Sequence, residues 1–105
     1  MRGLVYNNKE LAGYLTRTDS GKYIFEYESS YFEDKSKPSI SLSLPKKQQI
    51  HHSPTLFAFF FGLLSEGVNK DIQCSLLRID EKDHFKRLLL TAGLDTIGAI
   101  TVKPE

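Results

Sequence analysis

The 105-residue chain contains no tryptophan, one cysteine and one methionine, and its formal net charge is only +1. A lone cysteine, Cys74, cannot form an internal disulfide, which is typical of proteins from a reducing compartment. The small net charge and a pI of about 7.8 argue against a surface built to bind nucleic acid. The longest apolar run, residues 56–64, is far shorter than the ~20 residues that a membrane-spanning helix needs. We therefore expect a cytoplasmic protein that contacts neither nucleic acid nor a membrane directly, folded as one domain over residues 1–105.

The first half of the sequence is predicted to form strands. Apolar and polar residues alternate, or β-forming residues cluster, in four segments: 4–6, 10–17, 22–29 and 39–45. The segment TDSG (18–21) ends in glycine and predicts a hairpin turn between the second and third of these strands. Two polar segments, 29–38 and 46–54, are expected to be loops.

The stretch SISLSLP (39–45) shows the clearest alternation in the chain. A strand here would turn Ile40, Leu42 and Leu44 toward the core and the serines between them toward solvent. Pro45 would end the strand because proline cannot donate a hydrogen bond to a neighbouring strand.

The second half is predicted to be mainly helical. A helix over 54–64 would begin after Ser53 as its N-cap, with a proline in its first turn, and Gly67 would mark its end. Its apolar residues form two adjacent strips: Phe57, Phe60, Phe61 and Leu64 in one, and Leu56, Phe59 and Leu63 in the other.

A short helix or turn is expected near 69–77, followed by a last helix that Asp80 can cap and Gly93 can end. The core side of that last helix would hold Phe85, Leu88, Leu89 and Ala92. A final strand over 97–102 would return to the sheet. The predicted fold class is therefore α+β: a small antiparallel or mixed sheet, built from the N-terminal half and the last strand, packed against two or three helices.

Residues that carry chemistry are few and poorly placed for it. His51 and His52 are adjacent, so regular structure would point their side chains apart, and no metal site is expected. Cys74 with His84 as its base is the one nucleophilic pair to weigh, but nothing in the neighbouring sequence would activate the thiol. The glycines of GLDTIG (93–98) lack the Gly-Lys-Ser/Thr of a phosphate loop. We expect no catalytic, cofactor-binding or metal-binding residues.

The phenylalanine-rich helix leaves two interpretations open. Both apolar strips can be core, one against the sheet and one against the last helix. Alternatively, Leu56 and Phe59 belong in part to a patch that another protein covers, because aromatic side chains are enriched at the centres of protein interfaces. Several exposed phenylalanines on a small monomer would otherwise favour aggregation.

Three stretches, taken in series, resemble the N-terminal domain of the HipA family of serine/threonine kinase toxins. They are SISLSLP (39–45), FAFFFGLLSEG (57–67) and DHFKRLLLTAGLDTIGAITVKPE (83–105). The residues that carry the motif are Ser41, Leu42, Pro45, Gly93, Asp95, Gly98 and Ala99. One departure is Ser65, which stands where the family usually has proline.

The resemblance implies a detached domain, because no catalytic or nucleotide-binding motif of the kinase is present. Such domains occur in split, three-gene toxin–antitoxin systems (HipBST), where the small protein, HipS, binds a separate kinase, HipT, and can act as its antitoxin. A third protein, HipB, carries the DNA-binding helix-turn-helix. The implied mechanism is inhibitory docking on the N-lobe of the kinase, with Leu56, Phe59 and the turn Ser65, Glu66 and Gly67 as expected contacts.

Three alternatives remain at this level. The protein can be an assembly module that joins the kinase to a HipB-like repressor without inhibiting phosphorylation. It can be a small enzyme built on Cys74 and His84. It can also be a segment of a full-length HipA-like kinase, although the natural start MRGLVYN favours a complete small protein.

Overall fold

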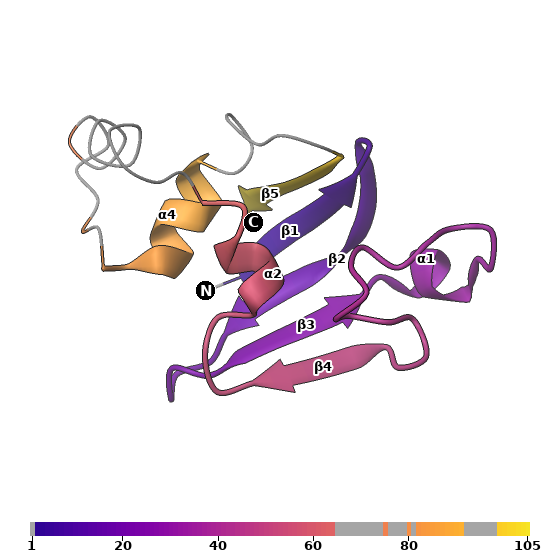
Figure 1. Ribbon diagram of the computed structural model, residues 1–105, viewed down its shortest axis with the longest axis horizontal. Coiled ribbons are helices and arrows are strands. Elements are labelled where there is room, and N and C mark those ends of the chain that lie inside the picture. The colour runs from indigo at the N-terminus through magenta and orange to yellow at the C-terminus, as the bar shows by residue number, and fades with distance from the viewer. Residues whose placement is uncertain (1, 65–74, 76–79, 81, 92–98) are drawn as a thin grey trace.

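The computed structural model describes residues 2–64, 75, 80, 82–91 and 99–105, and it shows an α+β fold (Figure 1). One layer is a five-stranded sheet with the strand order β4-β3-β2-β1-β5, in which every neighbouring pair is antiparallel. The strands are β1 (Arg2–Asn7), β2 (Glu10–Arg17), β3 (Tyr23–Tyr27), β4 (Ile50–Ser53) and β5 (Ile100–Pro104). The helices of the described part are α1 (Ser29–Glu33), α2 (Ala58–Phe61) and α4 (His84–Thr91). The predicted fold class is confirmed.

Two tight turns connect the first three strands. Asn8 and Lys9, between β1 and β2, have φ angles of 51° and 71°, and positive φ at both central residues is what a type I′ hairpin turn requires. Between β2 and β3, Gly21 adopts φ 83° and its N–H donates to the carbonyl of Thr18 at 3.0 Å. The hairpin predicted at 18–21 is confirmed.

The last strand returns to the sheet, as predicted. It pairs antiparallel with β1, and Val5 lies opposite Val102 at the centre of this pairing. The N–H of Asn8 also donates to the carbonyl of Ala99 at 3.0 Å, which ties the residue before β5 to the β1–β2 turn. The chain therefore closes its sheet by placing a C-terminal strand beside its N-terminal one.

The strand predicted over 39–45 is wrong. The segment is a loop, and only Ile40 and Leu44 are buried, whereas Leu42 is 100% exposed. The serines explain the difference, because the Ser41 hydroxyl accepts the Ser43 N–H at 3.2 Å and the Leu44 N–H donates to the Ser41 carbonyl at 3.1 Å. Hydroxyl side chains compete in this way with strand pairing and favour turns.

Two segments expected to be loops contain regular structure. Residues 29–33 form α1, whose first turn is capped by the Glu28 carboxylate accepting the Tyr31 N–H at 3.0 Å. Residues 50–53 form β4, which pairs with β3 at one edge of the sheet. The polar composition of both segments concealed their backbone pairing.

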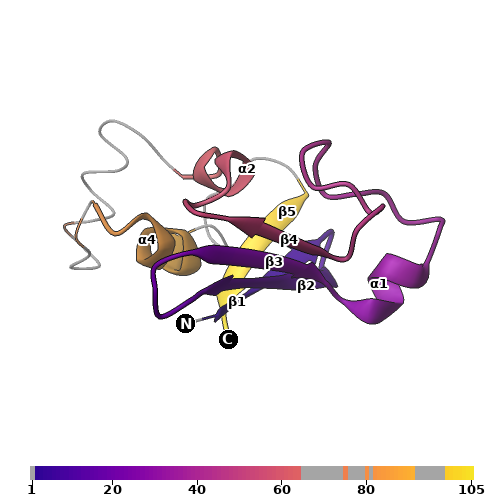
Figure 2. The ribbon, with the colours of Figure 1, turned by 90° about the horizontal axis from the view of Figure 1, so that it is seen from below.

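Helices α2 and α4 lie over one face of the sheet, and α1 lies beyond one end of the strands (Figures 1 and 2). Helix α4 begins at His84, and the capping residue is Asp83 rather than the predicted Asp80, since the Asp83 carboxylate accepts the Lys86 N–H at 3.1 Å. Asp80 instead accepts the Lys82 N–H at 2.9 Å in the preceding turn. No helix in the described part is long and apolar enough to cross a bilayer.

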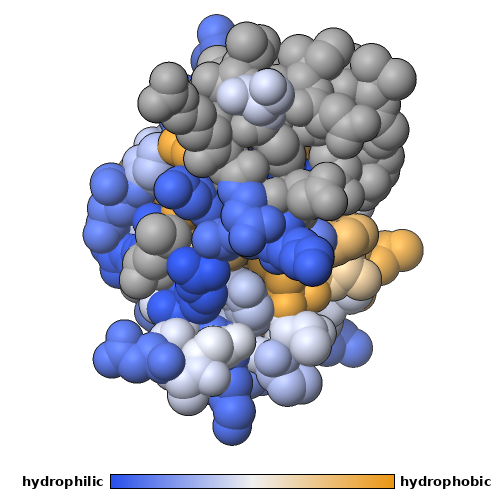
Figure 3. All heavy atoms as spheres, turned by 90° about the vertical axis from the view of Figure 1, so that its left-hand side faces the viewer, coloured by the Kyte–Doolittle hydropathy of each residue, from blue (hydrophilic) through white to orange (hydrophobic). Residues whose placement is uncertain are grey.

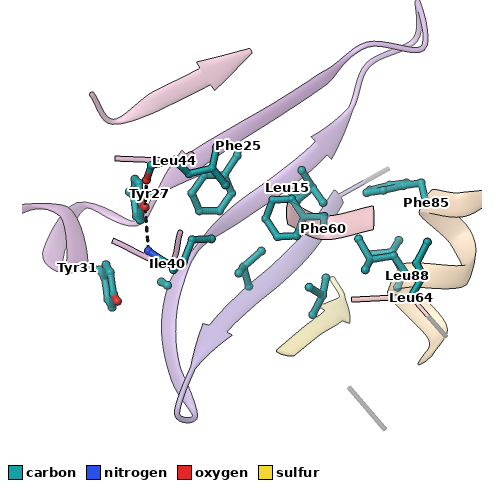
Figure 4. Close-up of a cluster of buried hydrophobic side chains, with 14 residues drawn as sticks. Leu15, Phe25, Tyr27, Tyr31, Ile40, Leu44, Phe60, Leu64, Phe85 and Leu88 are labelled. Carbon is teal, nitrogen blue, oxygen red and sulfur yellow. Dashed lines mark hydrogen bonds between the residues drawn. The ribbon is translucent and has the colours of Figure 1, made fainter. Parts of the chain in front are cut away.

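A continuous hydrophobic core runs between the sheet and the helices (Figure 4). Of the last helix's predicted core residues, Phe85, Leu88 and Leu89 are buried, and Ala92 lies outside the described residues. At the other end of the core, Tyr27 and Tyr31 stack with ring centroids 6.0 Å apart. The buried hydrophobic residues are Val5, Ala12, Leu15, Phe25, Tyr27, Tyr31, Ile40, Leu44, Phe60, Leu64, Phe85, Leu88, Leu89 and Val102.

Candidate partner-binding surface

The phenylalanine-rich segment forms a much shorter helix than predicted. Helix α2 covers only Ala58–Phe61, and its N-cap is Phe57, whose side chain makes no capping hydrogen bond. Ser53, the predicted cap, ends β4 instead, and its hydroxyl accepts the Thr55 N–H at 3.3 Å. A helix this short cannot carry a continuous apolar strip, so each phenylalanine has its own environment.

Phe60 fixes α2 to the sheet. Its side chain is fully buried, and its ring lies 5.6 Å from that of Phe25 on β3. The rings of Phe57 and Phe59 meet it edge-on, with centroids 6.1 Å and 5.2 Å away. Edge-to-face packing of this kind is the favoured arrangement of aromatic rings. The first interpretation, that the helix is core, is therefore confirmed for Phe60 and Leu64.

The two apolar residues expected to contact a partner are neither fully buried nor fully exposed. Leu56 and Phe59 are half-buried, and both pack in part against the chain's own core. Phe61 is the phenylalanine of α2 that solvent reaches most, with 40% of its surface exposed. The spacing of one helical turn from Phe57 predicted that Phe61 shares its apolar strip, but α2 begins only after Phe57.

Phe61 also connects α2 to α4. Its ring packs edge-on against the imidazole of His84 with centroids 4.9 Å apart, so this histidine has a packing role. Behind this contact, Arg17 bonds the Asp83 carboxylate at 3.2 Å and lies over the ring of Phe85. The exposed Phe61 therefore contacts a helix that is itself tied to the sheet through Arg17. Figure 3 shows hydrophobic surface exposed beside a band of hydrophilic side chains on the α4 side of the molecule.

Several predicted residues cannot be placed. Ser65, Glu66 and Gly67, Cys74, and the motif residues Gly93, Asp95 and Gly98 lie outside the described residues. Of the other motif residues, Ala99 is exposed next to β5, and Ser41, Leu42 and Pro45 lie on the loop beside α1. The motif residues of 39–45 therefore lie on a different part of the surface from α4, which is at the other end of the molecule, and α2 lies between them over the sheet (Figure 1).

Within the described part of the chain, no three histidine, cysteine or acidic side chains are grouped to hold a metal ion. His51 and His52 lie side by side on β4, with His51 half-buried and His52 exposed. The His51 Nε2 lies 3.0 Å from the Pro45 carbonyl oxygen and its ring contacts that of Tyr27, so it has a structural setting. The described residues therefore offer apolar and polar surface that a partner can contact.

Comparison with known proteins gives this surface its context. The HipA N-terminal domain family matches residues 3–103. An uncharacterized protein of Haemophilus influenzae is 37% identical over 110 residues, which cover 100% of this chain and 98% of that protein. A solved structure described as the N-terminal domain of HipA toxin matches with a TM-score of 0.72 and 34% identity, over 99% of this chain and 92% of the other.

Two longer relatives come from Sinorhizobium fredii and are named "Putative kinase Y4mE" and "Putative kinase Y4dM". They are 28% and 32% identical to this chain and align with 96% and 87% of it. The aligned part is only 24% of each of these two proteins, so the chain spans about a quarter of their length.

Proposed function

We propose that this chain, which belongs to the HipA N-terminal domain family, binds a separate HipA-like serine/threonine kinase in the cytoplasm and restrains its activity, as a HipS-like antitoxin does. The main support is a contrast among the relatives. The same domain makes up about a quarter of two proteins named as kinases, yet it accounts for 98% of the Haemophilus protein. A domain found both joined to a kinase-sized body and nearly alone is suited to bind that body as a separate chain.

The proposed contact is the surface formed by α2 and α4. Phe61 offers an exposed aromatic ring, with Leu56 and Phe59 half-buried beside it. The Phe61 ring packs edge-on against His84, which limits how much side-chain freedom it loses on binding and so favours affinity. In this proposal, Ser65, Glu66 and Gly67 are further contacts, made in the cleft of the kinase N-lobe.

Restraint requires that the chain bind the inactive kinase more tightly than the active one, because a ligand with equal affinity for both states shifts neither. The proposed role is binding without catalysis. The family match is to the N-terminal domain, which is not the catalytic kinase domain.

The test is phosphorylation by the HipA-like kinase of the same organism, measured with increasing amounts of this chain. We expect inhibition by the wild-type chain and weaker inhibition by Phe61→Asp. Ile50→Asp is the matched control, because Ile50 is also 40% exposed but lies on β4. Tight binding with an unchanged phosphorylation rate would overturn the restraint and leave an assembly module that links the kinase to a HipB-like repressor. Equal loss in both variants would contradict the assignment to α2.

A further inference from the structure

A single leucine on the loop beside α1 is completely exposed. Leu42 is 100% accessible, whereas Ile40 and Leu44, two positions away on either side, are 8% and 1% accessible. One exposed leucine is ordinary on a protein surface. What distinguishes Leu42 is that the chain on both sides of it is anchored in the core, so the side chain stands at the tip of a fixed turn.

The anchoring is made by one buried hydroxyl. The Tyr27 hydroxyl accepts the Ile40 N–H at 3.1 Å and donates to the Leu44 carbonyl, so it bridges the two ends of the turn (Figure 4). Within the turn, the Ser41 hydroxyl accepts the Ser43 N–H. A side chain presented on ordered backbone loses less conformational freedom on binding than one on a loose loop. The turn is therefore prepared for contact before any partner arrives.

The segment that carries Leu42 is rich in lysine. Residues 33–47 contain four lysines and two acidic residues. Lys37 pairs with Glu10 at 2.7 Å, but the Lys46 ammonium donates to two backbone carbonyls, those of Asp34 and Lys37. Lys35 and Lys47 are exposed. A partner surface that accommodates Leu42 and complements these charges is an apolar pocket with carboxylates on its rim.

We infer that Leu42 is a second anchor on the kinase of the proposed function, and that it enters an apolar pocket rimmed by carboxylates. This inference rests on the proposed function and adds a separate surface to it. The loop lies beside α1, whereas α2 lies over the middle of the sheet and α4 beyond it (Figure 1), so the two surfaces are separate. A protein several times larger than this chain, as the two named kinases are, can reach both surfaces, and two separate contacts would fix the orientation of the bound domain.

The experiment is a binding titration of the purified kinase with the wild-type chain, Leu42→Ser and Leu42→Met. Removing the leucine side chain from an apolar pocket is expected to weaken binding by about ten- to a hundredfold, whereas methionine, of similar volume, should bind within a fewfold of wild type. The thermal unfolding midpoint should not change in Leu42→Ser, because the side chain contacts nothing in the core. Reversing the charges of Lys35 and Lys47 should slow association and reduce its dependence on salt.

Each other outcome has a defined meaning. If the wild-type chain binds the kinase and Leu42→Ser binds equally well, the inference is overturned while the proposed function stands. If the wild-type chain does not bind, the proposed function fails and this inference fails with it. A lowered unfolding midpoint in Leu42→Ser would also overturn it, because Leu42 would then be packing within the chain. A wild-type dimer that Leu42→Ser converts to a monomer would assign the loop to self-association instead.

Discussion

The hydroxyl of Tyr27 donates a hydrogen bond to the carbonyl of Leu44, and this buried contact joins the sheet to the loop that replaces the predicted strand (Figure 4). The same hydroxyl accepts the Ile40 N–H, and the phenol ring lies between Phe25 and Tyr31 in the core. One side chain on β3 therefore supplies hydrogen bonds to two backbone groups that a strand neighbour would otherwise satisfy.

Replacing Tyr27 with phenylalanine should destabilise the protein strongly for so small a change. The variant keeps the ring but leaves the Ile40 N–H and the Leu44 carbonyl without this partner, and both residues are buried. An unsatisfied buried polar group costs about 1–3 kcal/mol, so we expect the free energy of unfolding in urea to fall by about 2–4 kcal/mol. Tyr6→Phe, at a half-buried tyrosine of β1, is the control and should change it by less than about 0.5 kcal/mol.

The same hydroxyl should make stability depend on alkaline pH. Burial raises the pKa of Tyr27, and the hydrogen bond from Ile40 offsets only part of that effect. The folded state then holds this proton more tightly than the unfolded state, in which tyrosine titrates near pH ~10. The stabilisation is fully present below that pH and is lost as pH rises through the raised pKa of the folded state. Urea midpoints between pH 8.5 and 11 should fall more steeply for wild type than for Tyr27→Phe, and parallel curves would contradict this.

The main outline of the fold could be predicted because its strongest signals are local. Gly21 ends a polar turn between alternating strands, and Phe85, Leu88 and Leu89 recur at helical spacing, and both patterns have the structure they indicate. The stretch 39–45 has an equally clear period of two but is a loop. The same sequence also fits a turn, in which Ile40 and Leu44 are buried on either side. Choosing between the two depends on the distant Tyr27 hydroxyl, which periodicity does not report.

The exposure of individual side chains in 56–64 could not be predicted from the sequence. The exposed ring of α2 belongs to Phe61, whereas the expected contact Phe59 is partly covered. Exposure around α2 is set by where the helix begins, and an N-cap without a capping side chain gives the sequence no marker for that point. Leu42 was predicted to face the core because it is apolar and alternates with serines. It is exposed because the segment is a turn and not a strand.

Two glycines differ in the room that the structure leaves for a side chain. A Cβ added at Gly13 on β2 would lie 2.5 Å from the Glu26 carbonyl oxygen and 2.8 Å from the ring of Phe25, so neighbouring backbone would have to move. Gly13→Ala is expected to lower the free energy of unfolding by about 1–3 kcal/mol. Gly62, at the end of α2, has a helical φ of −66°, and a Cβ added there would lie 3.4 Å from the Phe59 carbonyl oxygen, an ordinary contact distance. Gly62→Ala should therefore raise the free energy of unfolding by about 0.5 kcal/mol. Equal effects in urea denaturation would contradict this account.

Asp83 has two roles that substitutions can separate. Its carboxylate caps α4 through the Lys86 N–H and also pairs with Arg17 across to β2. Asp83→Asn keeps an oxygen for the cap and removes the charge, whereas Asp83→Ala removes both. Loss of a cap costs about 1 kcal/mol, and an ion pair whose side chains are about one-third exposed is worth less than that, so alanine should destabilise by about 1–2 kcal/mol and asparagine by about 0.5 kcal/mol or less.

The order of the two Asp83 variants is the informative result, measured as urea midpoints at low salt. If asparagine is as harmful as alanine, the ion pair with Arg17 and not the cap holds the start of α4. Repeating the titration in 1 M salt distinguishes them further, because salt screens an exposed ion pair but leaves a hydrogen bond to the backbone largely intact. A cap that dominates would place the start of α4, and with it the Phe61–His84 contact, under the control of a single local hydrogen bond.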